Sequence, residues 1–172
     1  NQIIKVIDID SVSSLDEVDS FKEGKIIASM KSSEAFENYW KNPKANNNAI
    51  IDGWYITGDI GYIDDEGDLF ITGRVDDMII SGGENILPIE IEDILSNYEA
   101  ISEVVVCGLP DERLGEIVTA FIKSTKEIET RLLDELFLKS DTAKFKRPRK
   151  YIFVDTIPKS PVGKVLRRQL KE

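Results

Sequence analysis

Three short segments of this 172-residue chain combine glycine with charged or hydroxyl side chains, a pattern suited to holding a small ligand. The first is Thr57-Gly58-Asp59, which Arg74 follows along the chain. A carboxylate beside a glycine can accept both hydroxyls of a vicinal diol such as ribose, and each hydrogen bond to a charged group is worth roughly 1.5–3 kcal/mol. The plainer alternative is an Asp in a turn that pairs with Arg74 on the surface, and these residues alone favour it.

The second and third segments are glycine loops of different kinds. Ser81-Gly82-Gly83-Glu84-Asn85 can let a ligand chain pass close to backbone amides, or it can be an ordinary strand-to-helix turn. Pro158 to Lys164 places a lysine behind a glycine, where a mobile loop can deliver a cation to a phosphate or carboxylate. The alternative for Lys164 is a solvated lysine, as most lysines are. Taken singly, both loops favour the alternative.

The stretch from Gly73 to Glu92 must position these segments, because it joins the first to the second and begins a helix. Its apolar run ends at the glycine pair, and Pro88 then stands where a first helical turn tolerates proline. Carboxylates at Glu90 and Glu92 suit the positive end of the helix dipole. Apolar residues recur from Ile91 at i, i+3, i+4 and i+7, which predicts a helix with one buried face.

The remaining pattern predicts an α+β fold. Before the central stretch, strands are expected at residues 3–10, 24–30, 60–63 and 69–72, with a short helix at 33–41 and breaks at Asn42-Pro43 and Asn46-Asn47-Asn48. After it, strands are expected at 103–108, 117–123 and 151–154, with helices at 131–139 and 165–171. Residues 75–172 therefore form a small domain with a three-stranded sheet and flanking helices. Residues 1–74 look like a β-rich remnant of something larger.

Composition excludes several kinds of chemistry. The chain has no histidine, which removes Ser-His-Asp and Cys-His nucleophiles and histidine metal sites. Its one cysteine, Cys107, excludes an internal disulfide and lies in an apolar run that favours a buried inert thiol. There is no apolar run long enough to span a membrane and no signal peptide pattern, so a cytoplasmic location is expected.

Charge is distributed unevenly along the chain. The net charge of −10 argues against general nucleic-acid binding. Residues 144–168 nevertheless hold nine Lys or Arg and one acid, Asp155. A basic segment on an acidic protein indicates one anionic partner at one place, although a solvated basic face is the simpler interpretation.

Taken together and in this order, the motifs GWYITGD, GRVDDMIISGGENILPIEIE, FKRPRKY and PKSPVGKVLRR resemble the C-terminal part of the acyl-adenylate-forming enzymes of the AMP-binding superfamily. The likeness is closest to acyl- and aryl-CoA synthetases of the chlorobenzoate and succinylbenzoate types, and it covers essentially the whole chain. In that family a carboxylate and ATP give an acyl-adenylate and pyrophosphate. A small C-terminal domain then rotates, and the thiol of CoA displaces AMP. The resemblance makes residues 1–74 the end of the large N-terminal domain and residues 75–172 the mobile C-terminal domain.

For the adenylation step the resemblance implies four roles. Asp59 takes the ribose hydroxyls of ATP or AMP, and Arg74 supports the same ribose. Lys164 is the catalytic lysine that bridges the substrate carboxylate and the α-phosphate. Asp76 is the hinge between the two steps. No metal ligand is expected within the chain, and the Mg²⁺ that accompanies ATP is assigned mainly to the absent N-terminal part.

For the CoA step the resemblance implies roles for five more residues. Gly82 and Gly83 line the path of the pantetheine arm. Phe145, Arg147 and Arg149 hold the CoA nucleotide, which gives the basic segment a purpose. A guanidinium binds phosphate bidentately, and a phenyl ring offers adenine a stacking face.

The chain also departs from the family. Leu114 replaces a Trp found in some aryl-CoA relatives, and Ile56 stands where many relatives have a basic or polar residue. The phosphate-binding loop, the tyrosine-glycine-x-threonine-glutamate motif and the acyl pocket are absent, so the chain is expected to be an inactive C-terminal fragment of an ATP-dependent acyl-CoA synthetase.

The expected partners are a small-molecule carboxylate, ATP, CoA and the missing domain, with no nucleic acid; the oligomeric state stays open. Three alternatives also stay open. They are an adenylation enzyme that loads a carrier protein, a luciferase-like oxidising enzyme, and a non-catalytic binding module. Residues 145–149 favour free CoA as the acceptor.

Overall fold

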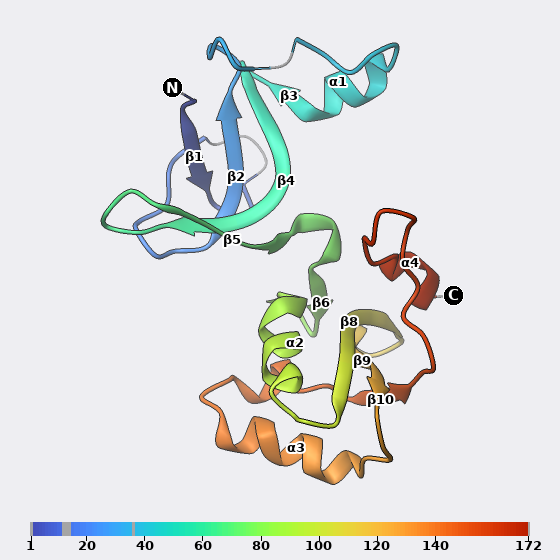
Figure 1. Cartoon of the computed structure of the whole chain (residues 1–172). Coiled ribbons are helices and arrows are strands. Elements are labelled where there is room, and N and C mark those ends of the chain that lie inside the picture. The colour runs from blue at the N-terminus through green and yellow to red at the C-terminus, as the bar shows by residue number, and fades with distance from the viewer. Residues whose placement is uncertain (1, 12–14, 36, 172) are drawn as a thin grey trace. The chain divides into compact units, whose positions relative to one another are not determined.

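The computed structural model describes residues 2–11, 15–35 and 37–171. The chain divides into two compact units, Asn1–Asp76 and Asp77–Glu172 (Figure 1). Each unit contains one β-sheet. None of the helices in the described residues is long and apolar enough to cross a membrane.

The first unit is built on a five-stranded sheet in which every pairing is antiparallel. Its strands are β1 (Ile4–Ile7), β2 (Gly24–Ser29), β3 (Ile50–Ile51), β4 (Trp54–Ile63) and β5 (Leu69–Arg74). The long strand β4 pairs with β2, β3 and β5, and Figure 1 shows it curving as it passes from one partner to the next. The buried apolar side chains of the first unit come from β1, β2 and β4: Val6, Ile7, Ile26, Ile27 and Ile60.

The helix predicted at 33–41 is wrong. Residues 33–35 and 40–41 form turns and a bend, residues 37–39 have no regular structure, and Phe36 lies outside the described residues. The helix of this unit is α1 (Pro43–Ala49), where a break was predicted. Asn42 caps it, because its side-chain oxygen accepts a hydrogen bond from the backbone N–H of Ala45 at 3.1 Å, and Pro43 occupies the first turn.

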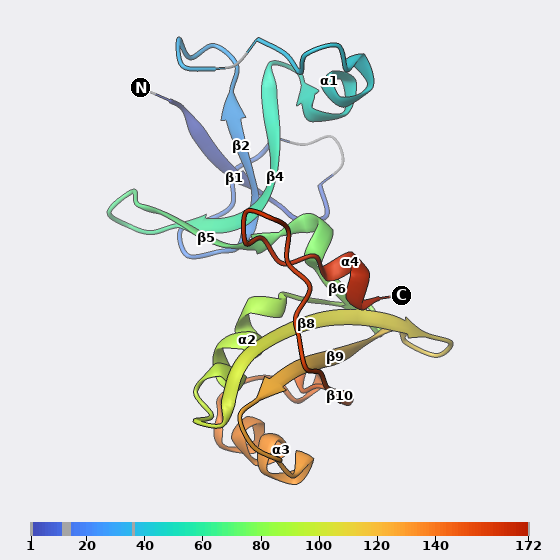
Figure 2. The ribbon, with the colours of Figure 1, turned by 45° about the vertical axis from the view of Figure 1, so that its right-hand side comes forward.

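The second unit contains a five-stranded sheet rather than the predicted three-stranded one. The three predicted strands are present as β8 (Ile101–Asp111), β9 (Gly115–Ser124) and β10 (Lys150–Phe153). Two more join the sheet, β6 (Ile79–Ser81) and β7 (Glu84–Ile86), each of three residues and too short to show an alternating pattern. Strand β10 runs parallel to β9, and the other pairings are antiparallel. Figure 2 shows β8 and β9 as long neighbouring strands.

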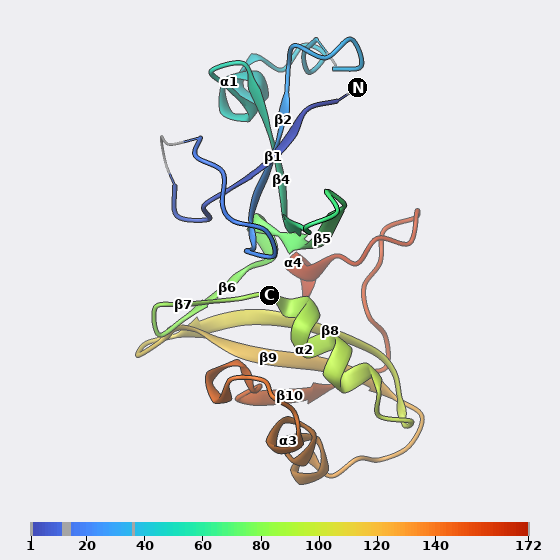
Figure 3. The ribbon, with the colours of Figure 1, turned by 90° about the vertical axis from the view of Figure 1, so that its left-hand side faces the viewer.

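Apolar side chains cover both faces of this second sheet. The helices of the unit are α2 (Pro88–Ser96), α3 (Thr130–Lys139) and the short α4 (Arg167–Leu170), and two 3-10 turns lie at η1 (Val75–Asp77) and η2 (Lys144–Lys146). Ile91 and Leu95 of α2 and Leu133 of α3 pack with sheet residues in one buried cluster. On the other face a second cluster comprises Val105, Cys107, Phe121 and Ile157, against which Val165 and Leu170 pack. Figure 3 shows α3 and α4 on opposite sides of the sheet.

Candidate functional site

Asp59 and Arg74 lie directly opposite each other on β4 and β5. Opposite residues of an antiparallel pair share a face, which brings Arg74 Nη1 to 2.7 Å from Asp59 Oδ1. Gly58 makes this approach possible, because a Cβ at that position would lie 2.8 Å from Arg74 Nη2. Gly58 also has φ +78°, a backbone conformation that favours glycine.

A threonine fixes the backbone beside this ion pair. The Thr57 hydroxyl donates to the carbonyl of Ile26 at 2.8 Å and accepts the backbone N–H of Asp59 at 3.0 Å. The side chains of Asp59 and Arg74 remain 29% and 42% exposed. The second carboxylate oxygen of Asp59 is therefore an acceptor held in a defined position at the surface, as a diol requires.

Lys164 lies on a tight hairpin that spans residues 158–166. Ser160 donates its N–H to the carbonyl of Lys164 at 2.8 Å, and its hydroxyl accepts the N–H of Lys164 at 3.1 Å. Gly163 turns the chain with φ +83°. Lys164 itself is exposed, and its ammonium forms no ion pair within the part of the chain that the structure describes. The hairpin thus presents a cation that no neighbouring carboxylate neutralises.

Ion pairs hold both ends of this hairpin, and sequence reasoning missed them. Near its start, Lys159 pairs with Glu103 of β8, and Lys123 reaches the same carboxylate at 3.3 Å. The ammonium of Lys159, and then that of Lys123, holds the pKa of Glu103 below its usual range. After it, Arg167 pairs with Glu92 of α2. The partners are 56 and 75 residues apart in sequence, and no local pattern signals such pairs.

Asp76 lies in η1 and is exposed. The boundary between the two compact units falls directly after it. Its neighbour Asp77 is half-buried and accepts an ion pair from Arg167 at 3.5 Å.

Gly82 and Gly83 form the two-residue turn of the β6–β7 hairpin, not a strand-to-helix turn. Both have positive φ, +63° and +89°, which suits the turns that join tightly paired strands. The N–H of Gly82 donates to the carbonyl of Leu114 at 2.9 Å. Leu114, the residue that departs from the aryl-CoA pattern, therefore lies beside the glycine turn.

Phe145, Arg147 and Arg149 are all exposed on the segment between α3 and β10, with Pro148 buried between the two arginines. The N–H of Arg149 donates to the carbonyl of Val118 at 2.8 Å, which fixes the end of this segment against β9. Among the residues that the structure describes, Arg147 has one long contact to a carboxylate, 3.8 Å to that of Asp134.

Asp111, at the end of β8, accepts hydrogen bonds from the β8–β9 turn. Its pKa is lowered chiefly by hydrogen bonds from the N–H groups of Leu114 and Arg113, and the charge of Arg149 adds to this effect. Arg149 and Gly82 both contact the β8–β9 pair, Arg149 at Val118 of β9 and Gly82 at Leu114 of the turn.

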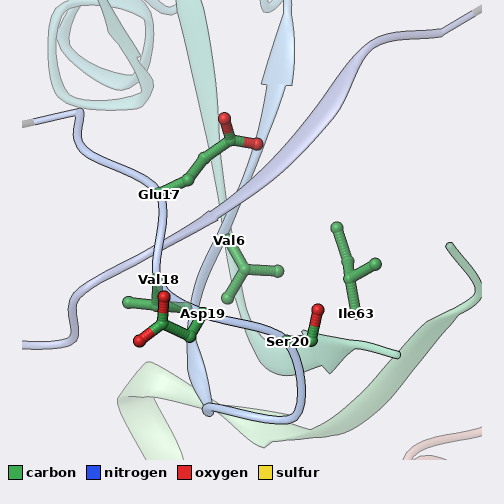
Figure 4. Close-up of a pocket in the computed structure, with 6 residues that line it drawn as sticks. All are labelled: Val6, Glu17, Val18, Asp19, Ser20 and Ile63. Atoms are coloured by element: carbon green, nitrogen blue, oxygen red, sulfur yellow. The ribbon is translucent and has the colours of Figure 1, made fainter. Parts of the chain in front are cut away.

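A separate pocket of about 400 Å³ lies in the first unit (Figure 4). Val6, Val18 and Ile63 contribute apolar side chains, and Figure 4 shows the carboxylates of Glu17 and Asp19 pointing in different directions. None of the candidate residues lines this pocket, so it is not the predicted site.

Two other kinds of site are unsupported. The described residues contain no group of three or more His, Cys, Asp or Glu side chains that could hold a metal ion. Burial raises the pKa of the Cys107 thiol to about 11, which keeps it protonated near neutral pH and makes it a poor nucleophile.

A family model and individual known proteins both match this chain, and they point to the same family. The family model described as the AMP-binding enzyme C-terminal domain matches residues 90–164. A 4-chlorobenzoate–CoA ligase of Arthrobacter is 45% identical over 150 residues, which is 87% of this chain and 29% of the relative. A fatty acid–[acyl-carrier-protein] ligase of Streptomyces coeruleorubidus is 42% identical over 135 residues, which is 78% of this chain and 26% of the relative.

The solved structures agree in fold. The o-succinylbenzoate CoA synthetase of Bacillus subtilis, in complex with its acyl-adenylate intermediate, matches with a TM-score of 0.87 and 32% identity, over 99% of this chain and 34% of that one. The same enzyme with ATP and a magnesium ion matches with a TM-score of 0.85. The chain therefore spans about a third or less of the length of these relatives.

Proposed function

Because this chain belongs to the AMP-binding enzyme family, whose C-terminal domain model matches residues 90–164, we propose that it is the C-terminal part of an ATP-dependent acyl-CoA synthetase. The parent protein joins a carboxylate to ATP, releases pyrophosphate, and transfers the acyl group from the adenylate to the thiol of CoA with release of AMP. Residues 1–74 belong to its large domain and residues 75–172 form its mobile domain, with Asp76 as the pivot. By itself the chain is inactive, because the acyl pocket and the phosphate-binding loop belong to the rest of the parent.

The observation that carries this proposal is the unpaired ammonium of Lys164 on its hydrogen-bonded hairpin. Adenylation brings a carboxylate up to an anionic α-phosphate, and an ammonium between them lowers their repulsion. Fixed donors and cations aimed at developing charge are worth about 3–4 kcal/mol of barrier. Lysine suits a group that must arrive and leave, since it is a compact charge on a flexible stem.

The Asp59–Arg74 pair supports a nucleotide role in the same reaction. Arg74 occupies one oxygen of the carboxylate, and the other oxygen accepts the ribose hydroxyls of ATP. Because Arg74 and Thr57 hold the carboxylate and its backbone in place before the nucleotide arrives, little ordering of this site is needed on binding. We assign the Mg²⁺ that accompanies ATP mainly to the part of the parent that lies outside this chain.

Free CoA is the proposed acceptor. Phe145 stacks on its adenine, and Arg147 and Arg149 bind its phosphates, while the Gly82–Gly83 turn admits the pantetheine arm. A carrier protein is the second candidate, because one relative at 42% identity is a fatty acid–[acyl-carrier-protein] ligase. In the full-length parent, release of AMP that depends on free CoA supports the first candidate, and release that depends only on a carrier-bound thiol supports the second.

The test of the proposal is Lys164→Ala in the full-length parent, with the two half-reactions assayed separately. Adenylation, measured as exchange of pyrophosphate into ATP, should fall by about 10²–10³. Thioester formation from a supplied acyl-adenylate should remain within about twofold, because the lysine acts only where charge develops in the first step. Lys126→Ala, which removes another exposed lysine of the same unit, should change neither. Equal loss of both half-reactions, or no loss, would overturn the proposed role.

A further inference from the structure

The chain that follows the Lys164 hairpin packs firmly on the second unit. Val165 and Leu170 contact the apolar cluster that contains Cys107 and Phe121. Lys171 pairs with Glu116 of β9 at 3.5 Å. The hairpin therefore extends from a segment that is held on the sheet by apolar and polar contacts.

Arg167, in this segment, makes several polar contacts with the rest of the second unit. Its Nη2 lies 2.7 Å from Glu92 Oε1 on α2, and its Nη1 lies 3.5 Å from Asp77 Oδ2. Its Nε points to the carbonyl of Val106 on β8 at 3.5 Å. One guanidinium thus joins three separate elements of the second unit.

The cluster is only partly exposed. Side-chain exposure is 23% for Arg167, 13% for Glu92 and 31% for Asp77. Glu92 Oε1 also accepts the N–H of Val106 at 2.8 Å, so this carboxylate holds a fixed position beside the cation. The planar fork of arginine can serve two carboxylates at once, which the single ammonium of a lysine does less well.

We infer that Arg167 is a positioning residue of the reaction proposed above, because it ties the hairpin of Lys164 to Asp77, the residue that directly follows the proposed pivot. The inference rests on the proposed function. Asp77, Arg167 and Lys164 all belong to the second unit. Rotation at Asp76 is therefore transmitted to Lys164 through a charge-assisted contact as well as through the backbone.

The activity test uses Arg167→Met in the full-length parent, which keeps most of the side-chain volume and removes the fork. Adenylation should fall by about 10- to 100-fold, because displacement of a reacting group by an ångström costs up to that much. Thioester formation from a supplied acyl-adenylate should stay within about threefold, which a merely misfolded variant would not allow. Arg167→Lys should recover part of the adenylation rate. The matched control is Arg131→Met, which removes a surface ion pair with Glu135 from the same unit.

A second readout uses the single cysteine of the 172-residue chain. Cys107 lies beneath the segment that Arg167 holds, so labelling of its thiol by an aromatic disulfide reports release of that segment. The thiol of Cys107 should be labelled about tenfold faster in Arg167→Met than in the wild type. This rate should not change in low urea, because a local opening exposes little surface and is therefore insensitive to denaturant. Arg131→Met should label at the wild-type rate.

The outcomes separate this inference from the proposed function. If Lys164→Ala abolishes adenylation but Arg167→Met leaves both adenylation and thiol labelling unchanged, the inference fails and the proposed function stands. If Lys164→Ala has no effect, the proposed function fails and the positioning role fails with it. If Arg167→Met does not fold, Asp77→Asn removes the charge from the other side of the same contact, and normal adenylation in that variant overturns the inference.

Discussion

The two units of this chain both contain a five-stranded sheet, but they differ in what covers it. In the second unit α2 and α3 bury one face and residues 157–170 cover the other. In the first unit α1 contributes no buried residue. Phe21 and Ile71 are 60% and 65% exposed there, whereas Ile122 in the second sheet is fully buried. A sheet with a covered face gains stability from each strand, while exposed apolar side chains contribute little.

This difference separates the proposed roles as well. The first unit carries an acceptor, Asp59, fixed on paired strands. The second carries a cation, Lys164, on a hairpin that a complete core supports. A lysine that moves together with its domain keeps its position only if the domain has a well-packed core. A carboxylate that binds a ligand from paired strands is positioned by the strands themselves.

The largest expected effect on stability comes from the buried core of the second unit. Ile122→Ala should cost about 3 kcal/mol of the unfolding free energy of the second unit, since it leaves a cavity among α2, α3 and the sheet. Ile71→Ala in the first unit should cost less than about 0.5 kcal/mol, because that side chain is mostly in water. Urea unfolding followed by far-ultraviolet circular dichroism, to which α2 and α3 contribute, measures the first change.

Tryptophan fluorescence isolates the other unit, because Trp40 and Trp54 both belong to residues 1–76. Ile122→Ala should leave the fluorescence midpoint unchanged while the dichroism midpoint falls. A common shift of both midpoints would mean that the two units unfold together, and the contrast drawn here between them would be wrong.

The sequence predicted the long elements of the second unit well, because they show clear periodicity or capping, whereas of β4 in the first unit it predicted only residues 60–63. The helix at Pro88 and the strands around Val105 and Phe121 are confirmed. The short hairpin from Ile79 to Ile86 was missed, since three-residue strands show no period. The helix at 33–41 was predicted from an apolar spacing, but the cap signal of Asn42-Pro43 was the stronger determinant.

In the candidate site, contacts within short motifs could be predicted and contacts between distant residues could not. The sequence allows the Asp59–Arg74 contact as a surface pair, because both residues lie in short motifs. The contacts that hold the Lys164 hairpin were not predicted, because Arg167 and Asp77 are 90 residues apart. Pairing of distant charges is set by tertiary packing, and a single sequence carries no signal for it.

A smaller effect tests the polar edge of the second core. The hydroxyl of Tyr151 donates to Asp134 at 2.9 Å, and burial, followed by this hydrogen bond to the carboxylate, raises the pKa of Tyr151. Tyr151→Phe should cost about 1–2 kcal/mol of unfolding free energy, because it leaves the half-buried carboxylate without that donor. Tyr98→Phe is the matched control, since Tyr98 packs on the same cluster and its hydroxyl makes no hydrogen bond within the described residues. Equal losses in both variants would assign the effect to packing.

Among the polar contacts, the smallest expected change in stability belongs to the ion pair of the first unit. Asp59→Asn should lower the unfolding free energy, followed by tryptophan fluorescence, by no more than about 1 kcal/mol, because exposed ion pairs contribute little. In the full-length parent the same change should raise KM for ATP by about tenfold, since a ribose hydroxyl bound to a carboxylate is worth roughly 1.5–3 kcal/mol. Asp65→Asn, at an exposed position of the β4–β5 loop, should alter neither quantity. A stability loss of several kcal/mol would make the pair a structural element, and an unchanged KM would remove Asp59 from the nucleotide site. The combination of a small structural and a large kinetic effect is therefore what distinguishes a binding carboxylate from a carboxylate that only supports the sheet.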